Sequence, residues 1–175
     1  METIAFYRES VIKTYGLVER TDLCLVTIAL PSDRMGDWGT VLADLTARLD
    51  VSLLLLLARP LPANGLRLLL LLDKSPSGRG RMEAEQVFLD EFQAPWRVDQ
   101  AVELVYFQGP HYGDRYGIAS AALNALAVQN VPVLAMVCSG ASVYLITPEG
   151  KARLAREALG KAFMTPETEK QETGI

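Results

Sequence analysis

The chain has 175 residues, of which 50% are hydrophobic and 22% charged, and its formal net charge at pH 7 is −4. This composition can fill a core, which excludes disorder of the whole chain, and an acidic balance without a Lys/Arg cluster argues against a nucleic-acid partner. The amino terminus lacks the basic region of a secretory signal, and the apolar runs over 51–58 and 68–72 are far shorter than the roughly 20 residues of a membrane span. We therefore expect a cytoplasmic protein that binds no nucleic acid and no membrane.

The first half of the sequence alternates between patterns typical of strands and of helices. Apolar residues at helical spacing predict an amphipathic helix after the first loop, and two leucine-rich runs on either side of Pro62–Gly65 predict a β-hairpin. In chain order, the expected elements are a strand over 24–30, a loop over 31–39, a helix over 41–49, strands over 51–58 and 68–72, a helix over 81–92 and a strand over 96–102.

The second half repeats this order. The expected elements are a strand over 102–107, a loop over 109–117, a helix over 118–129, strands over 131–137 and 142–147, and a helix over 151–163. Apolar residues at helical spacing mark the buried side of each helix. The predicted buried residues are Ile118, Ala122, Leu123 and Leu126 in the first helix, and Leu154, Ala155, Leu159 and Phe163 in the second.

The clearest signal in the sequence is an internal repeat. The stretch Gly36–Gly39 aligns with Gly113–Gly117, and each stands between a predicted strand and a predicted helix. Each half then yields strand, helix, strand, strand and helix, which is most of a split βαβ, ferredoxin-like unit. We therefore predict an α+β fold of two ferredoxin-like units in tandem, each an antiparallel sheet with helices on one face.

The second unit needs a further strand, because none follows the last predicted helix. Residues 10–18 can serve the second unit or a dimer edge, whereas residues 6–15 also fit a helix. The expected domains are an N-terminal segment over 1–20, a first module over 21–100, a second module over 101–164 and a flexible tail over 165–175.

Residues 105–163 resemble an ACT domain, the small regulatory module of aspartokinases and other enzymes of amino-acid pathways. The first half resembles a more divergent ACT domain, so the resemblance covers roughly residues 21–163. The stretches that carry it are the loop and helix start Gly113–Ala119, the segments Asn130–Val133 and Val137–Val143, and Pro148-Glu149 followed by a helix ending in Phe163.

This resemblance implies tandem ACT modules that associate through their sheet edges, as a homodimer, and that bind an amino-acid effector at the interface between modules. The effector's backbone groups would meet the glycine loop and the following helix start, and its side chain the second strand of a neighbour. Glycine allows close approach to a ligand, and amides at a helix start favour a carboxylate. The candidate ligand-binding residues are Gly36, Asp37, Trp38, Gly39, Gly113, Asp114, Arg115, Tyr116, Gly117, Ile118, Asn130 and Val131.

The sequence departs from the family in one respect, because no kinase, dehydrogenase or other catalytic domain accompanies the modules. We therefore expect a stand-alone regulator that acts in trans on a partner enzyme of amino-acid metabolism. The alternative is a structural or protein-interaction module whose glycine loops are plain turns. In that case Trp38 fills a hydrophobic gap, and Arg115 is solvated or paired with Asp114.

No constellation of catalytic or metal-binding residues stands out. His111 is the only histidine and has no Cys or second His near it in the sequence. Cys24 and Cys138 each stand in an apolar run and are expected to be buried free thiols. Because no nucleophile has a matching base, we expect that the protein is not an enzyme and needs neither cofactor nor metal.

Overall fold

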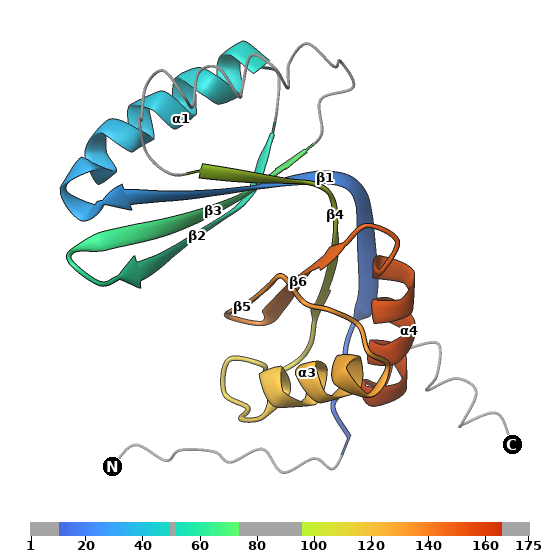
Figure 1. Ribbon diagram of the computed structural model, residues 1–175. Coiled ribbons are helices and arrows are strands. Elements are labelled where there is room, and N and C mark those ends of the chain that lie inside the picture. Colours follow the sequence, from blue (N-terminus) through green and yellow to red (C-terminus); the bar gives the residue numbers. More distant parts are fainter. Residues whose placement is uncertain (1–10, 50–51, 74–95, 166–175) are drawn as a thin grey trace, which may run out of the picture. The chain divides into compact units, whose positions relative to one another are not determined.

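The structure is a computed structural model and describes residues 11–49, 52–73 and 96–165 (Figure 1). No helix of this part of the chain is long and apolar enough to cross a membrane. The elements, in chain order, are β1 (Gly16–Pro31), the 3₁₀-helix η1 (Ser32–Arg34), α1 (Met35–Leu49), β2 (Leu53–Leu61), β3 (Gly65–Asp73), β4 (Trp96–Gln108), α3 (Ile118–Val128), β5 (Ala135–Ser139), β6 (Ser142–Pro148) and α4 (Ala152–Ala162).

Two strands, β1 and β4, contribute to both of the compact units into which the chain divides. One unit consists of residues 22–101, and the other of residues 1–21 together with 102–175. The strands follow one another by hydrogen bonding in the order β2-β3-β1-β4-β6-β5. Each long strand changes unit at a residue with a left-handed backbone, Asp22 (φ 58°) or Ala101 (φ 56°), a conformation that costs an L-residue about 1–2 kcal/mol. The two strands predicted to meet at residue 102 are thus the single strand β4.

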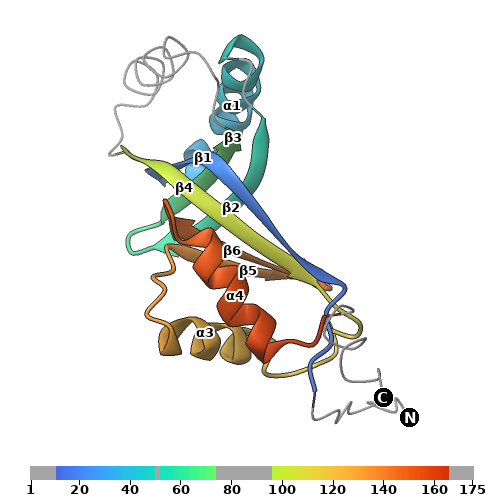
Figure 2. The same ribbon diagram turned by 90° about the vertical axis from the view of Figure 1, so that its right-hand side faces the viewer.

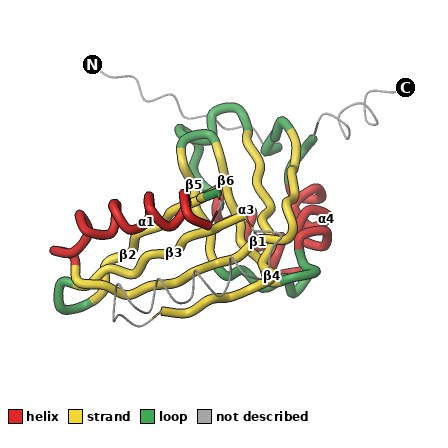
Figure 3. Tube along the Cα trace, turned by 90° about the horizontal axis from the view of Figure 1, so that it is seen from above, coloured by secondary structure: helices red, strands yellow, loops and turns green. Residues whose placement is uncertain are grey.

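In the unit of residues 22–101, α1 covers one face of the antiparallel sheet (Figure 3). Strands β1 and β3 pair so that Ile28 lies opposite Leu68, and both side chains are buried. The indole of Trp38 reaches into the same core from α1. The buried side chains of this core are Val26, Ile28, Leu30, Trp38, Leu68, Leu70 and Leu72.

The predicted β-hairpin of this unit is confirmed. β2 and β3 pair antiparallel up to Leu61 opposite Gly65. Between them, Ala63 (φ 59°) and Asn64 (φ 55°) have the left-handed backbone that a tight turn between twisted strands requires. The helix predicted over 81–92 lies outside the described residues.

In the other unit, α3 and α4 lie together on one face of the sheet of β4, β5 and β6 (Figure 2). β6 is the middle strand of these three, with Leu145 opposite both Val105 and Met136. The helices and the sheet share one core. Its buried residues are Val105, Phe107, Tyr112, Ile118, Ala122, Leu126, Val131, Val143, Leu145, Ala152, Ala155, Ala158, Leu159 and Phe163.

Two details of the sequence prediction are wrong in this unit. Leu123 is 41% exposed rather than part of the buried stripe, because it lies about 140° round the helix from Ile118 and about 100° from Ala122. The strand predicted from Val131 begins only at Ala135. Val131 instead donates its N–H to the Leu126 carbonyl, 2.9 Å away, and so belongs to the end of α3.

Residues 11–15, just ahead of β1, are extended rather than helical. Lys13 forms a parallel bridge with Met164, after the end of α4. The Thr14 N–H donates to the Met164 carbonyl and the Met164 N–H donates to the Ile12 carbonyl, each over 2.8 Å. The Tyr15 N–H donates to the carbonyl of Gln108, the last residue of β4, over 2.8 Å. The chain ahead of β1 is therefore held by the ends of β4 and α4.

Candidate functional site

The first part of the 109–117 loop is filled by its own side chain. Tyr112 is only 6% exposed, and its ring meets Phe107 edge to face with centroids 6.0 Å apart. A Cβ atom on Gly109 would collide with the Tyr112 ring and would lie 2.5 Å from the Lys13 carbonyl oxygen. This part of the loop therefore packs against the chain ahead of β1 and leaves no space for a ligand.

The second part of the loop is open. A Cβ on Gly113 would come no closer than 3.9 Å to another atom, the Gly140 carbonyl oxygen, and the Tyr116 side chain is 88% exposed. Gly117 is the N-cap of α3, has a left-handed backbone (φ 90°) and has no neighbouring atom where a side chain would stand. Gly117 has no side chain with which to cap α3, and the first turn of α3 has no acidic residue. Amides at such a helix start favour a carboxylate or another anion.

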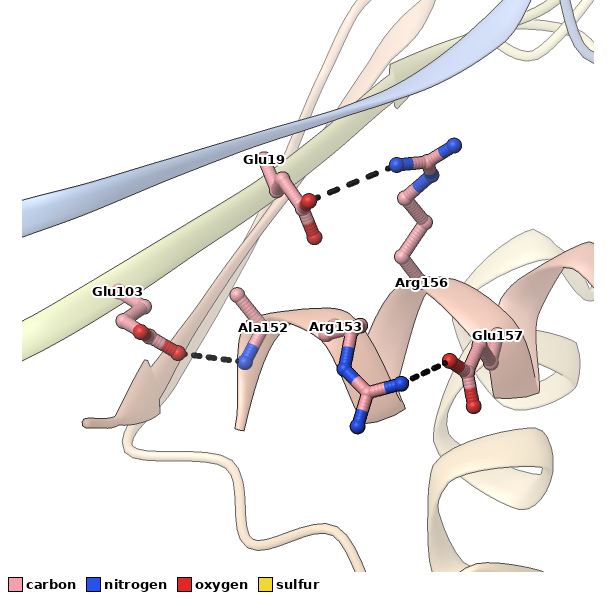
Figure 4. A network of polar contacts seen from close by, with 6 residues as sticks. All are labelled: Glu19, Glu103, Ala152, Arg153, Arg156 and Glu157. Atoms are coloured by element: carbon pink, nitrogen blue, oxygen red, sulfur yellow. Dashed lines mark hydrogen bonds and ion pairs between the residues drawn. The ribbon is translucent and has the colours of Figure 1, made fainter. Parts of the chain in front are cut away.

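The start of α4 is different, because the protein supplies its own carboxylate there. The Ala152 N–H donates to Oε2 of Glu103 over 2.6 Å, and Glu103 is only 8% exposed (Figure 4). Further along α4, Nη1 of Arg156 lies 3.4 Å from Oε1 of Glu19, a residue of β1. Sequence analysis missed Glu103, although a lone charged residue in the apolar strand 102–107 was a usable signal.

The predicted residues of this unit fall at both ends of α3. Asp114 and Arg115 lie in the open loop, where the Asp114 N–H donates to the His111 carbonyl and Arg115 Nη1 donates to the Val11 carbonyl, 3.2 Å away. Ile118, at the start of α3, points into the core.

Asn130 and Val131 follow the other end of the helix. Asn130 has a left-handed backbone (φ 51°) and Val131 is 6% exposed. Because α3 has 11 residues, its ends lie about 16 Å apart. One unit by itself does not bring Asn130 and Val131 together with residues 113–117.

The prediction of a glycine loop over residues 31–39, in the other unit, is wrong. β1 continues to Pro31, and Gly36, Asp37, Trp38 and Gly39 lie in the first turns of α1. Asp37 Oδ2 accepts from Arg34 Nε over 3.3 Å at the surface, and Trp38 is 2% exposed in the core. Two helical glycines cost about 1 kcal/mol each, which burial of an indole offsets. Trp38 thus fills the core, as in the alternative interpretation, and the two glycine stretches differ in conformation.

The cysteines are less buried than the sequence predicts. Cys24 is half-buried, and Cys138, on the edge strand β5, is exposed. Local desolvation nevertheless raises the pKa of the Cys138 thiol, which keeps it protonated at neutral pH. Among the residues that the structure describes, no group of three or more His, Cys, Asp or Glu side chains is placed to hold a metal ion.

We expect the Tyr112 hydroxyl to ionise at a higher pH than that of an exposed tyrosine. Burial raises the pKa of Tyr112 to about 12 and outweighs the opposite influences of Thr14 and Arg115. Because the unfolded chain loses this proton near pH 10, the contribution of Tyr112 to stability is complete below pH 10 and is lost as the pH rises toward 12. Absorbance titration should show a late tyrosinate step that disappears in Tyr112→Phe and remains in Tyr116→Phe. A late step that survives in Tyr112→Phe contradicts this assignment.

The sequence and the architecture were compared with known proteins, and only the architecture has significant matches. No protein-family model matches the sequence, and no curated protein is significantly similar to it. Antiparallel strands with helices on one face, in two units that share β1 and β4, nevertheless define a tandem of ferredoxin-like modules of the ACT type.

Solved structures with this fold include regulatory subunits of aspartate kinase and parts of whole aspartate kinases. The regulatory subunit of aspartate kinase from Thermus thermophilus matches with a TM-score of 0.71 and 15% identity, over 86% of this chain and 98% of that one. Aspartate kinase from Clostridium acetobutylicum matches with a TM-score of 0.74 and 14% identity, over 90% of this chain and 36% of that one. E. coli aspartokinase III in complex with lysine and aspartate matches with a TM-score of 0.57 and 17% identity, over 90% of this chain and 35% of that one. The predicted tandem ACT fold is thereby confirmed.

Proposed function

We propose that this protein is a regulatory module that binds an amino acid at the open loop 113–117 and the start of α3. The observation that carries this proposal is the contrast between two helix starts in one unit. The Ala152 N–H at the start of α4 already holds the carboxylate of Glu103, whereas α3 begins at Gly117, which has no side chain to cap it. A ligand carboxylate fits the amides of α3 for the same reason that Glu103 fits those of α4.

The remaining loop residues suit the rest of an amino acid. Gly113 and Gly117 have space on their Cα sides, which lets a ligand approach the backbone. The Asp114 carboxylate can pair with an ammonium group. Asn130 lies past the far end of α3, so it reaches a ligand only from a neighbouring module, whereas Val131 is buried in the core of its own unit. We therefore propose that the effector is shared between modules of a homodimer formed through sheet edges.

The comparison with aspartate kinases supports a regulatory rather than a catalytic role. The match with the Thermus thermophilus regulatory subunit covers 98% of that chain, and E. coli aspartokinase III was solved with lysine and aspartate bound. We propose that the present chain is a cytoplasmic, non-catalytic sensor that acts in trans on a partner enzyme of amino-acid metabolism.

A thermal-shift screen against the proteinogenic L-amino acids tests this proposal. A ligand at a hundred times its dissociation constant stabilises the native state by about 2.7 kcal/mol, which raises the melting temperature by several degrees. Asp114→Asn removes the proposed ammonium partner and should abolish the shift. Glu157→Gln is the matched control, because Glu157 is an exposed carboxylate on α4 with an ion pair to Arg153, and it should preserve the shift. A shift that survives Asp114→Asn, or one that vanishes in Glu157→Gln, places the site elsewhere.

The second candidate function is a protein-interaction module. Tyr106 and Tyr144 stack across β4 and β6 with ring centroids 5.9 Å apart, and both are half-buried. They alternate with Phe107 and Val143, which face the helices, so the stacked rings lie on the opposite face of the sheet. If no amino acid raises the melting temperature in the thermal-shift screen, this second function is favoured, because such a pair of stacked rings suits a protein partner.

A further inference from the structure

The 109–117 loop is connected to the chain ahead of β1 by two sets of contacts, one at its filled first part and one at its open second part. At its closed end, the Gln108 carbonyl accepts from the Thr14 hydroxyl (2.6 Å) and from the Tyr15 N–H (2.8 Å). Thr14 is 3% exposed, and its hydrogen bond to Gln108 is partly buried. At the open end, Arg115 Nη1 donates to the Val11 carbonyl over 3.2 Å, and this contact is exposed.

We propose that Arg115 couples the ligand loop to residues 11–15. In the structure, its guanidinium holds the Val11 carbonyl from a position two residues before the N-cap of α3. A guanidinium bonds a carboxylate more strongly than it bonds a neutral carbonyl. A carboxylate ligand at the α3 start therefore draws Arg115 away from Val11 and releases the segment. The regulatory meaning of this exchange rests on the function proposed above, whereas the contact itself does not.

The two contacts differ in how easily they exchange. The bonds to Gln108 are backed by the Tyr112 ring, which fills the space beside Gly109 and Lys13. They stay in place when a ligand binds, because no ligand has room there. The Arg115 contact lies at the surface, where a stronger acceptor can replace Val11. Release is therefore confined to the bonds between residues 11–14 and Met164, whereas the bonds to Gln108 and the core of the unit do not change.

Hydrogen exchange of the Thr14 and Met164 amides in the full chain measures this coupling, because these two amides join residues 12–14 to the chain after α4. Arg115→Ala should speed their exchange about three- to tenfold, as expected for loss of one hydrogen bond. Arg115→Lys should restore most of the protection, because an ammonium N–H can reach a single carbonyl. Arg153→Ala is the matched control, since Arg153 pairs with Glu157 at the surface of α4. It should leave both amides unchanged.

The L-amino acids of the thermal-shift screen supply the ligand arm of the test. An amino acid that stabilises the wild type should speed exchange at Thr14 and Met164 as much as Arg115→Ala does, and should add nothing in that variant. The coupling is overturned if Arg115→Ala leaves both amides unchanged, if Arg153→Ala has the same effect, or if a stabilising amino acid leaves exchange unaltered. If no amino acid stabilises the protein but Arg115→Ala releases the segment, the proposed ligand class fails and the coupling by Arg115 stands.

Discussion

Replacing Gly109 by alanine is expected to destabilise the protein more than any other single-methyl change in this loop. The new Cβ would collide with the Tyr112 ring and would lie 2.5 Å from the Lys13 carbonyl oxygen. Backbone cannot yield as a flexible side chain does, and Tyr112 is packed against Phe107. We expect a loss of about 3 kcal/mol and a fall in melting temperature of roughly 10 °C. Thermal and urea denaturation measure both quantities.

Gly113→Ala provides a matched control in the same loop. It makes the same chemical change four residues later, where the closest atom to the new Cβ is 3.9 Å away. Because Gly113 does not have a left-handed backbone, we expect a change of about 0.5 kcal/mol or less. Equal losses in the two variants would show that glycine flexibility, rather than the contact of Gly109 with Tyr112 and Lys13, determines the stability of the loop.

Replacing Glu103 by alanine is expected to have the second large effect. Glu103 is nearly fully buried in β4, and its Oε2 accepts the Ala152 N–H over 2.6 Å. Alanine leaves that amide without its acceptor, removes a negative charge from the positive end of the α4 dipole and opens a cavity. We expect a loss of about 2–3 kcal/mol in the free energy of unfolding. Glu103→Gln keeps an acceptor oxygen and should lose only about 1 kcal/mol.

Glu157→Ala is the control for Glu103. Its carboxylate also contacts a group of α4, Arg153 Nη1, over 3.0 Å, but at the surface. An exposed pair of this kind contributes about 0.3–0.5 kcal/mol. Hydrogen exchange of the first turn of α4 should be faster in Glu103→Ala than in Glu157→Ala. Equal stability of these two variants would mean that the buried carboxylate does not hold the start of α4.

The element types were largely predictable because hydrophobic periodicity is a local property. The leucine-rich runs around Pro62–Gly65 form the predicted hairpin, and helices occupy most of 41–49, 118–129 and 151–163. In α4, Leu159 and Phe163 are buried as predicted. The errors lie where two conformations fit the same local pattern. Residues 31–39 contain enough Gly, Pro and Asp for a loop, yet burial of Trp38 favours an early helix start.

The candidate site was predictable only in part. The glycine pattern correctly marks 113–117 as an exposed stretch ahead of a helix, because Gly113 and Gly117 punctuate the chain there. The carboxylate that caps α4 comes from Glu103, 49 residues before Ala152. The contact of Arg115 joins residues 104 positions apart in the chain. No spacing rule covers such pairs, because the packing of the sheet against the helices brings them together.

The sequence by itself therefore determined the type of most strands and helices and showed that their order repeats along the chain. Tertiary structure decided that β1 and β4 each serve both units, that one helix start is closed by Glu103 while the other stays open, and that Arg115 holds Val11. The physical reason is the range of the interactions. Periodicity and turn chemistry act over a few neighbouring residues, whereas burial and buried hydrogen bonds depend on which distant segments pack together.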